Sequence, residues 1–475
     1  MGQQIKDSAT TKSVPHRRFL SPRPSGEGSQ SPSTRLREWD GLYAGEPEAC
    51  RRSLRPFLLT CTHLALLFAV FKVYRIEGRA FQMLVGLAIM ALPVHYLTPY
   101  RWKKPLFVAT SIAGMFGVFG TETAAIVLGF ASALIGICYL PIAWKLRAGL
   151  VAGVGTAMAF ARPETVATAI PDIVWPVLGS IFMFRMIIYM YELKHAKKRE
   201  PLVDTLGYFF LLPNSCFMHF PVVDYRTLQR GYFADDVHAL HRRGLQMMFR
   251  GTVHLLCYRL IYHSDMLVPP AEVQGLTMLL SYLVCNYLLY LRVSGQFHMA
   301  CGMLHLFGHQ LPDTHHHFLL ATGFTDYWRR INIYWKDFMV RIFFNPVVFK
   351  LKRWPQPAAL AVATLVVFGA TWILHAYQSY WLRGTWGFSV TDGLFWGILG
   401  TLVLINVQLD ARRSRVRRPA RKAGPTPWRQ SIRPLAVRAL RTAATFLTIT
   451  LLWSLWSSPS VSAWLDMLDR GLRGL

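Results

Sequence analysis

One histidine in this sequence lies where an ionisable group is costly. His375 follows the apolar run 358–372 and is surrounded by aromatic residues. An ionisable side chain inside a membrane-like segment indicates function by default. Imidazole titrates near neutral pH, which suits a general base. The alternative interpretation is a core histidine that is hydrogen-bonded to a neighbour.

A second group of polar side chains lies in the aromatic stretch Phe324–Phe338. Its Asn332 could orient a reacting group or donate a hydrogen bond to an oxyanion. Arg329, Arg330 and Lys336 could bind the phosphates of a cofactor. The alternative is an interfacial amphipathic helix with Lys and Arg side chains that reach the headgroups, beside a Trp/Tyr belt. Spacing alone leaves both interpretations open.

Three consecutive histidines, His315–His317, raise the question of a metal site. His305, His309 and Asp313 lie nearby in the sequence. Adjacent residues of a helix point about 100° apart, so three neighbouring rings would not converge on one ion. The sequence therefore predicts no metal site.

The composition indicates which elements must hold these residues. Hydrophobic residues make up 53% of the chain and charged residues 16%, a balance typical of a multi-spanning membrane protein. The net charge is +27, yet the basic residues lie mainly between apolar segments. That placement indicates membrane topology and anionic headgroups and argues against a nucleic-acid partner.

The hydropathy pattern predicts an all-α, polytopic transmembrane bundle of about eleven spans plus re-entrant or interfacial helices. The segment 205–223 contains prolines and an asparagine and is expected to be broken or re-entrant. Residues 293–357 show no clean span and are expected at the cytoplasmic face or dipping into it. The predicted spans are 56–74, 80–98, 105–121, 123–143, 148–163, 171–193, 245–264, 273–291, 358–380, 390–409 and 440–457.

The chain divides into a tail, one membrane domain and a second tail. Residues 1–55 are rich in Ser, Pro, Gly and Arg, which predicts a disordered cytoplasmic tail. A single membrane-embedded domain is expected over 56–458, with a basic cytoplasmic loop at 410–437 and a C-terminal tail at 459–475. The alternation of basic connectors places the N terminus in the cytoplasm and the C terminus outside.

Several stretches in a fixed order resemble the membrane-bound O-acyltransferase (MBOAT) family, and bacterial members in particular. The resemblance is strongest over 200–380, whereas the rest of the chain resembles the family only in its topology. The stretches that carry it are Phe220–Arg226, Val293–Gly302, Leu311–Asp313, Tyr327–Ile333 and Thr371–Ala376.

The resemblance implies an MBOAT-like fold and transfer of an acyl group, with acetyl expected, from acyl-CoA or acetyl-CoA to a hydroxyl. It implies that His375 is the general base and that Asn332 assists it. The donor would be bound by Arg329, Arg330, Lys336 and Trp328. No permanently bound cofactor is expected, and the donor is a substrate.

The resemblance favours a cell-surface or exported glycan as acceptor, in a bacterial inner membrane. The predicted partners are the acyl donor, the acceptor, membrane lipids and a periplasmic or membrane protein. One alternative acceptor is a lipid or sterol-like alcohol. Two alternatives of a different class are a non-catalytic transporter or flippase and a histidine-based metal transporter.

Overall fold

The chain folds into helices, as the hydropathy pattern predicts. The computed structural model describes residues 46–162, 170–196, 200–215, 223–416 and 428–473. About 80% of the described residues are helical. The described part contains no strand, only an isolated bridge between Tyr232 and His309. The all-α prediction is confirmed at this level.

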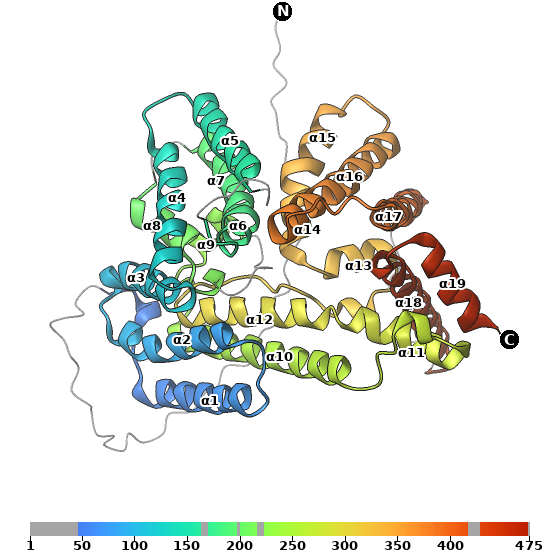
Figure 1. The fold of residues 1–475 in the computed structure, drawn as a ribbon, viewed down its shortest axis with the longest axis horizontal. Coiled ribbons are helices and arrows are strands. Elements are labelled where there is room, and N and C mark those ends of the chain that lie inside the picture. The colour runs from blue at the N-terminus through green and yellow to red at the C-terminus, as the bar shows by residue number, and fades with distance from the viewer. Residues whose placement is uncertain (1–45, 163–169, 197–199, 216–222, 417–427, 474–475) are drawn as a thin grey trace, which may run out of the picture. The chain divides into compact units, whose positions relative to one another are not determined.

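Figure 1 shows the order and arrangement of the helices. Those of the first half are α1 (Leu54–Val73), α2 (Arg79–Leu97), α3 (Tyr100–Phe119), α4 (Thr121–Tyr139), α5 (Trp144–Ala161), α6 (Val174–Pro176), the π-helical η2 (Val177–Phe182), α7 (Met183–His195), α8 (Leu202–Phe209), α9 (Tyr225–Arg230) and α10 (Val237–His263). Those of the second half are α11 (Gly275–Leu288), α12 (Leu291–Leu306), α13 (Phe324–Arg330), α14 (Ile333–Met339), the π-helical η6 (Val340–Phe344), α15 (Asn345–Lys350), α16 (Gln356–Arg383), α17 (Val390–Val416), α18 (Trp428–Ser457) and α19 (Val461–Leu472). The single-turn 3₁₀ helices are η1 (Glu48–Cys50), η3 (Leu212–Ser215), η4 (Pro270–Glu272) and η5 (Phe318–Leu320).

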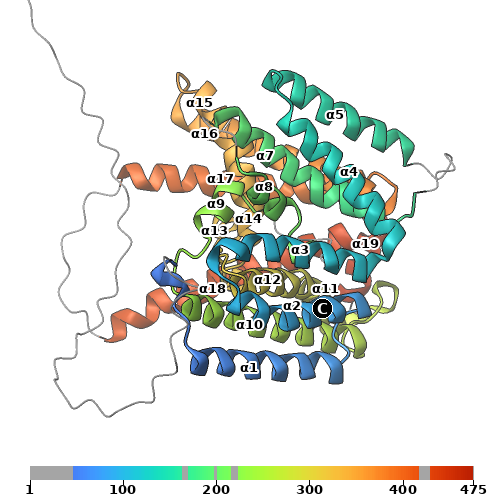
Figure 2. The same cartoon turned by 90° about the vertical axis from the view of Figure 1, so that its left-hand side faces the viewer.

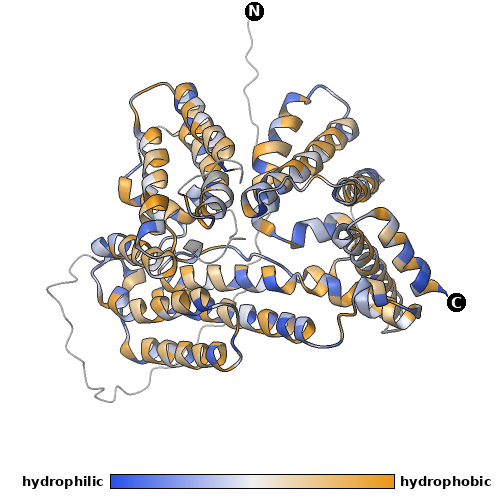
Figure 3. Cartoon of the chain, in the orientation of Figure 1, coloured by the Kyte–Doolittle hydropathy of each residue, from blue (hydrophilic) through white to orange (hydrophobic). Residues whose placement is uncertain are grey.

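Eight helical segments of the described part are long and apolar enough to cross a membrane. Figure 3 shows hydrophobic residues along most of the long helices. Each predicted span overlaps a helix, but α3, α5 and α10 do not qualify as spans by length and composition. The predicted count of about eleven spans therefore stays a prediction. The eight segments are Leu54–Val73, Arg79–Leu97, Thr121–Tyr139, Val174–His195, Gly275–Leu306, Gln356–Arg383, Val390–Arg412 and Leu435–Ser457.

Helices α10 and α12 lie side by side along much of their length (Figures 1 and 2). Glycines let the two backbones approach closely. A Cβ on Gly251 would lie 2.8 Å from the carbonyl oxygen of Gly295, and one on Gly302 would lie 2.7 Å from that of Gly244. Only glycine fits such an approach, as in the small-residue contacts of membrane helices.

A second hydrophobic cluster joins α13 and α14 to α16, α17 and α18. Within it, the ring of Trp328 packs on Phe368 of α16, with 4.7 Å between the ring centroids. Phe324 N–H and the side chain of Asn406 in α17 form a hydrogen bond of 2.9 Å. These contacts hold the aromatic stretch Phe324–Phe338 against α17 and against α16, the helix that carries His375.

An ion-pair network connects this region to the first half of the chain. Glu192 of α7 is buried and pairs with Arg226 of α9 and with Arg341 of η6. Arg341 also pairs with Asp224 at 2.7 Å. Because Arg341 lies just after α14, the network restrains the end of that helix.

The expected placement of residues 293–357 at the cytoplasmic face, or dipping into it, stays a prediction, but the segment begins within a helix. Residues 291–306 form α12, and most of its side chains are buried against protein. The segment gives a weak hydropathy signal because its glycines and histidines pack against α10 rather than against lipid.

The observed helix bounds differ from the predicted domain boundaries at both tails and at the basic loop. Helix α1 begins at Leu54, and Arg52 already pairs with Glu46 at 2.7 Å. The expected tail 459–475 contains α19, which packs on α11 through Met467. Within the expected loop 410–437, α17 continues to Val416 and α18 starts at Trp428. Residues 1–45 and 417–427 lie outside the described part.

The segment expected to be broken, 205–223, is interrupted where it is described. Helix α8 ends at Phe209, and the short η3 covers Leu212–Ser215. Pro213 falls within that turn, where a regular helix would lose a backbone hydrogen bond. Residues 216–222, which include Pro221, lie outside the described part.

Candidate active site

Asn332 and His375 line one cavity of about 590 Å³, although they are far apart in the sequence. Its walls come from α7, α12, α14, α16, α17 and α18 and from the segments between helices. The lining residues are Phe184, Leu289, Tyr290, Val293, Phe297, Asn332, Trp335, Trp372, His375, Ala376, Gln378, Ser379, Leu382, Arg383, Gly387, Asp392, Trp453, Trp456 and Ser457.

Asn332 lies at the turn between α13 and α14. Its backbone has φ +39° and ψ +63°, in the left-handed region that asparagine tolerates better than most residues. The Oδ1 atom of Asn332 accepts a hydrogen bond of 3.3 Å from the backbone N–H of Trp335 and thereby caps α14. Because Oδ1 is the acceptor in the cap, the amide nitrogen is the donor available to a bound molecule.

His375 is half-buried and lies among tryptophan rings. Its ring centroid is 5.4 Å from that of Trp335, 4.8 Å from Trp396 and 6.2 Å from Trp456. Trp335 contacts His375 with its ring and Asn332 with its backbone. One residue thus connects the two predicted catalytic groups.

Other polar residues of the cavity come from three helices. Gln378 and Ser379 lie one turn after His375 on α16, and Ser457 ends α18. Asp392, near the start of α17, accepts hydrogen bonds from the indole N–H of Trp456 and the hydroxyl of Ser389. The cavity therefore combines amide, hydroxyl and carboxylate groups with aromatic walls.

The four residues expected to bind the donor lie on α13 and α14, and none lines this cavity. Arg330 pairs with Asp326 at 2.7 Å, and Lys336 pairs with Asp337 at 2.6 Å. Arg329 is exposed. Trp328 packs on the α16 side chain of Phe368. Their predicted role stays a prediction.

The pKa of Asp326 reflects opposing effects. Burial raises this pKa. Hydrogen bonds from Arg330 and from the N–H and hydroxyl of Thr322 lower it, and together they outweigh the effect of burial. The net pKa is lower than usual, so Asp326 is ionised at neutral pH. The carboxylate therefore holds Arg330 in place.

The side chains of His315–His317 do not point toward one common site. His315 is buried and its Nε2 is 2.9 Å from the hydroxyl oxygen of Tyr290, which lines the cavity. Burial and the neighbouring His298 keep the pKa of His315 well below its usual value, so the ring is neutral. His316 and His317 contact each other instead. No group of three metal-binding side chains occurs within the described ranges.

The sequence interpretation missed Asp392, Tyr290 and Gln378. Asp392 gave a signal, because it is an acidic residue at the start of an apolar helix. Gln378 follows His375 by three positions, a spacing that places two residues on one helix face. Tyr290 gave no comparable signal, since tyrosines are common at the ends of membrane helices.

Comparison with known proteins adds no relative to this picture. No family model matches the chain, and no curated protein matches it.

Proposed function

We propose that this protein is a membrane O-acyltransferase that moves an acyl group from a thioester donor to a hydroxyl. The observation that supports it best is the shared cavity of Asn332 and His375. The resemblance to the MBOAT family supports the same activity. The proposed location is a bacterial inner membrane.

In the proposed reaction, His375 accepts the proton of the acceptor hydroxyl as the oxygen attacks the thioester carbonyl. The new O–C bond forms, the C–S bond breaks, and the proton passes to the leaving thiolate. The amide nitrogen of Asn332 donates a hydrogen bond to the carbonyl oxygen while negative charge develops there.

The cavity favours a polyhydroxylated acceptor over a lipid alcohol. Gln378, Ser379, Asp392 and Ser457 supply donors and acceptors for sugar hydroxyls. The tryptophan walls offer flat apolar surfaces on which sugar rings pack. We therefore propose a glycan as acceptor and acetyl as the transferred group.

The donor is proposed to enter from the cytoplasm, where acyl-CoA occurs. Arg330 and Lys336 already form ion pairs with neighbouring carboxylates, and binding a phosphate would compete with those pairs. Arg329 is exposed and could contact the donor phosphates directly. Replacing Arg329 with Gln would then raise the KM for acetyl-CoA while leaving kcat nearly unchanged.

The proposal is tested by His375→Ala in purified, full-length protein. With labelled acetyl-CoA, we expect thiol release and acyl transfer to a glycan acceptor to fall at least about a hundredfold. His63→Ala serves as a matched control, because His63 is exposed on α1 and does not line the cavity. Equal activity of His375→Ala and the wild-type protein would exclude His375 as the base.

A further inference from the structure

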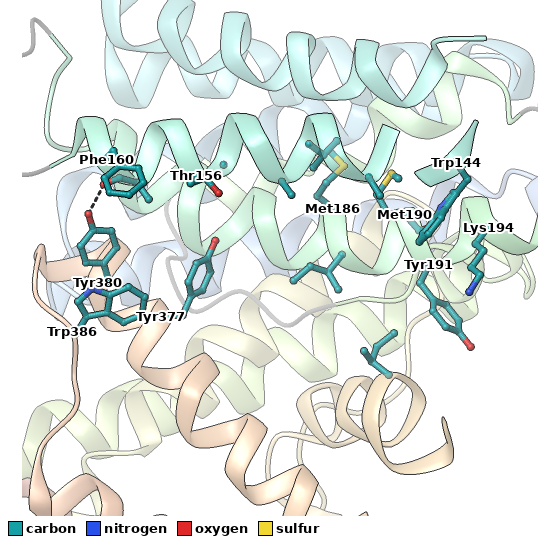
Figure 4. Close-up of a pocket in the computed structure, with 17 residues that line it drawn as sticks. Trp144, Thr156, Phe160, Met186, Met190, Tyr191, Lys194, Tyr377, Tyr380 and Trp386 are labelled. Atoms are coloured by element: carbon teal, nitrogen blue, oxygen red, sulfur yellow. Dashed lines mark hydrogen bonds between the residues drawn. The ribbon is translucent and has the colours of Figure 1, made fainter. Parts of the chain in front are cut away.

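We propose that a second cavity, between α5, α7 and α16, binds one anionic membrane lipid. This cavity has a volume of about 940 Å³ and is lined mainly by apolar side chains (Figure 4). The ligand class is a molecule with a long alkyl chain and an anionic head. The inference does not depend on acyl transfer.

The α5 wall has the length and shape of a chain-binding groove. The lining residues recur at helical spacing from Trp144 to Phe160, a rise of about 24 Å. That length approaches the thickness of a bilayer hydrocarbon core, which is about 30 Å. Between the two aromatic residues, this wall includes Ala148, Ala152 and Gly155, whose small side chains leave room for an alkyl chain.

Helix α5 is sparsely packed for an apolar helix. Only Gly155 and Met158 are buried among its residues. Figure 2 shows α5 at the edge of the bundle, beside α4 and α7. An alkyl chain in this cavity would cover the apolar surface that the protein leaves uncovered.

The two ends of the cavity differ in chemistry (Figure 4). One end has Trp144, Tyr191 and Lys194, with the Lys194 ammonium 5.3 Å from the Trp144 ring centroid. The other end has Tyr380 and Trp386, whose rings stack at 4.9 Å. A lipid would place its anionic head at the first end and its chain toward the second.

Lys194 provides the charge that selects an anionic head. Among the described residues that line this cavity, it is the one that carries a charge. Glu192, two positions earlier on α7, already pairs with Arg226 and Arg341. A phosphate or carboxylate head would therefore meet a cation beside an aromatic ring, as at membrane interfaces.

This cavity is separate from the candidate active site. Tyr377 lines the lipid cavity, whereas its neighbours Ala376 and Gln378 line the other one. Phe184 contacts Tyr377 from the active-site side, with 6.0 Å between the ring centroids. A bound lipid would thus pack against the opposite face of the helix that carries His375.

The test is native mass spectrometry of the full-length protein loaded with phosphatidylglycerol or phosphatidylcholine. We expect one phosphatidylglycerol molecule to stay bound after detergent removal. Ala152→Trp fills the cavity and should abolish the adduct. Ala157→Trp is the matched control, because Ala157 is also exposed on α5 but does not line the cavity.

A charge variant tests the head group. Lys194→Gln should lower the ratio of phosphatidylglycerol to phosphatidylcholine adducts about fivefold, whereas Lys145→Gln, which alters an exposed lysine outside the cavity, should not. The mass of an adduct carried over from cells distinguishes a phospholipid from a fatty acid, and either fits the proposal. The proposal is overturned if no adduct is retained or if Ala152→Trp and Ala157→Trp reduce it equally.

Discussion

At the residue scale, Asn332 combines a structural and a proposed chemical role. Its left-handed backbone and its cap on α14 explain an asparagine at this turn without any reaction. Its position in the cavity with His375 is the additional observation that favours chemistry. The two roles use different atoms of one amide, so substitution can separate them.

Asn332→Asp keeps an oxygen for the cap and a residue that tolerates the left-handed region, but it removes the N–H donor. We expect kcat to fall about a hundredfold, because a donor to the developing oxyanion is lost. The melting temperature should stay close to that of the wild-type protein. Steady-state acyl-transfer kinetics together with thermal unfolding measure both effects.

Asn332→Gly provides the complementary control. Glycine adopts the backbone conformation easily but loses both the cap and the donor. We expect the same loss of kcat with a small loss of stability. Full activity in Asn332→Asp would instead show that the residue only caps α14.

At the element scale, the close pair α10 and α12 determines where the site can form. Helix α12 supplies Val293 and Phe297 to the cavity. Its glycines Gly295 and Gly302 face Gly251 and Gly244 of α10. The stretch Val293–Gly302, one of those that resemble the MBOAT family, thus packs on α10 and also contributes residues to the cavity wall.

Gly251→Val is expected to disrupt this pair. The added Cβ would lie 2.8 Å from a backbone oxygen and 2.9 Å from the side chain of Met299, and a backbone atom cannot simply rotate away. Such overpacking costs at least about 1–3 kcal/mol of unfolding free energy. Thermal unfolding in detergent, followed by size-exclusion chromatography, measures the loss.

Gly149→Val is the matched control for that experiment. Gly149 lies within α5, and a Cβ there meets nothing within 4 Å. Its stability should equal or slightly exceed that of the wild-type protein, since valine favours a helix more than glycine does. If both variants unfold at the wild-type temperature, the α10–α12 contact is not as tight as described.

At the scale of the whole molecule, charge determines how the bundle is expected to lie in the membrane. The connector before α18 is densely basic, and α18 includes one of the eight candidate spans. Basic connectors stay in the cytoplasm. This argument concerns one crossing only, so it does not depend on the total number of spans.

A C-terminal alkaline phosphatase fusion tests this orientation. We expect the fusion after Leu475 to be active, because α18 would carry the C terminus to the outside. A fusion inserted within 417–427 should be inactive, since that connector is expected in the cytoplasm. The reverse pattern would contradict the predicted topology and the proposed cytoplasmic entry of the donor.

The sequence by itself determined the helical class and placed each predicted span on a helix. Hydropathy is a local property of twenty or so residues, so a segment such as 358–380 is recognisable without its neighbours. It also singled out Asn332 and His375, because a polar group between apolar helices is conspicuous. The order of the motifs suggested that the two belong to one site.

Only the tertiary structure decided which other residues share that site. Asp392 and Tyr290 reach the cavity through helix packing, a long-range property that local composition does not encode. Helix α12 escaped prediction for the same reason, since a helix buried in protein need not be uniformly apolar. Hydropathy describes contact with lipid, whereas the cavity is defined by contacts between helices.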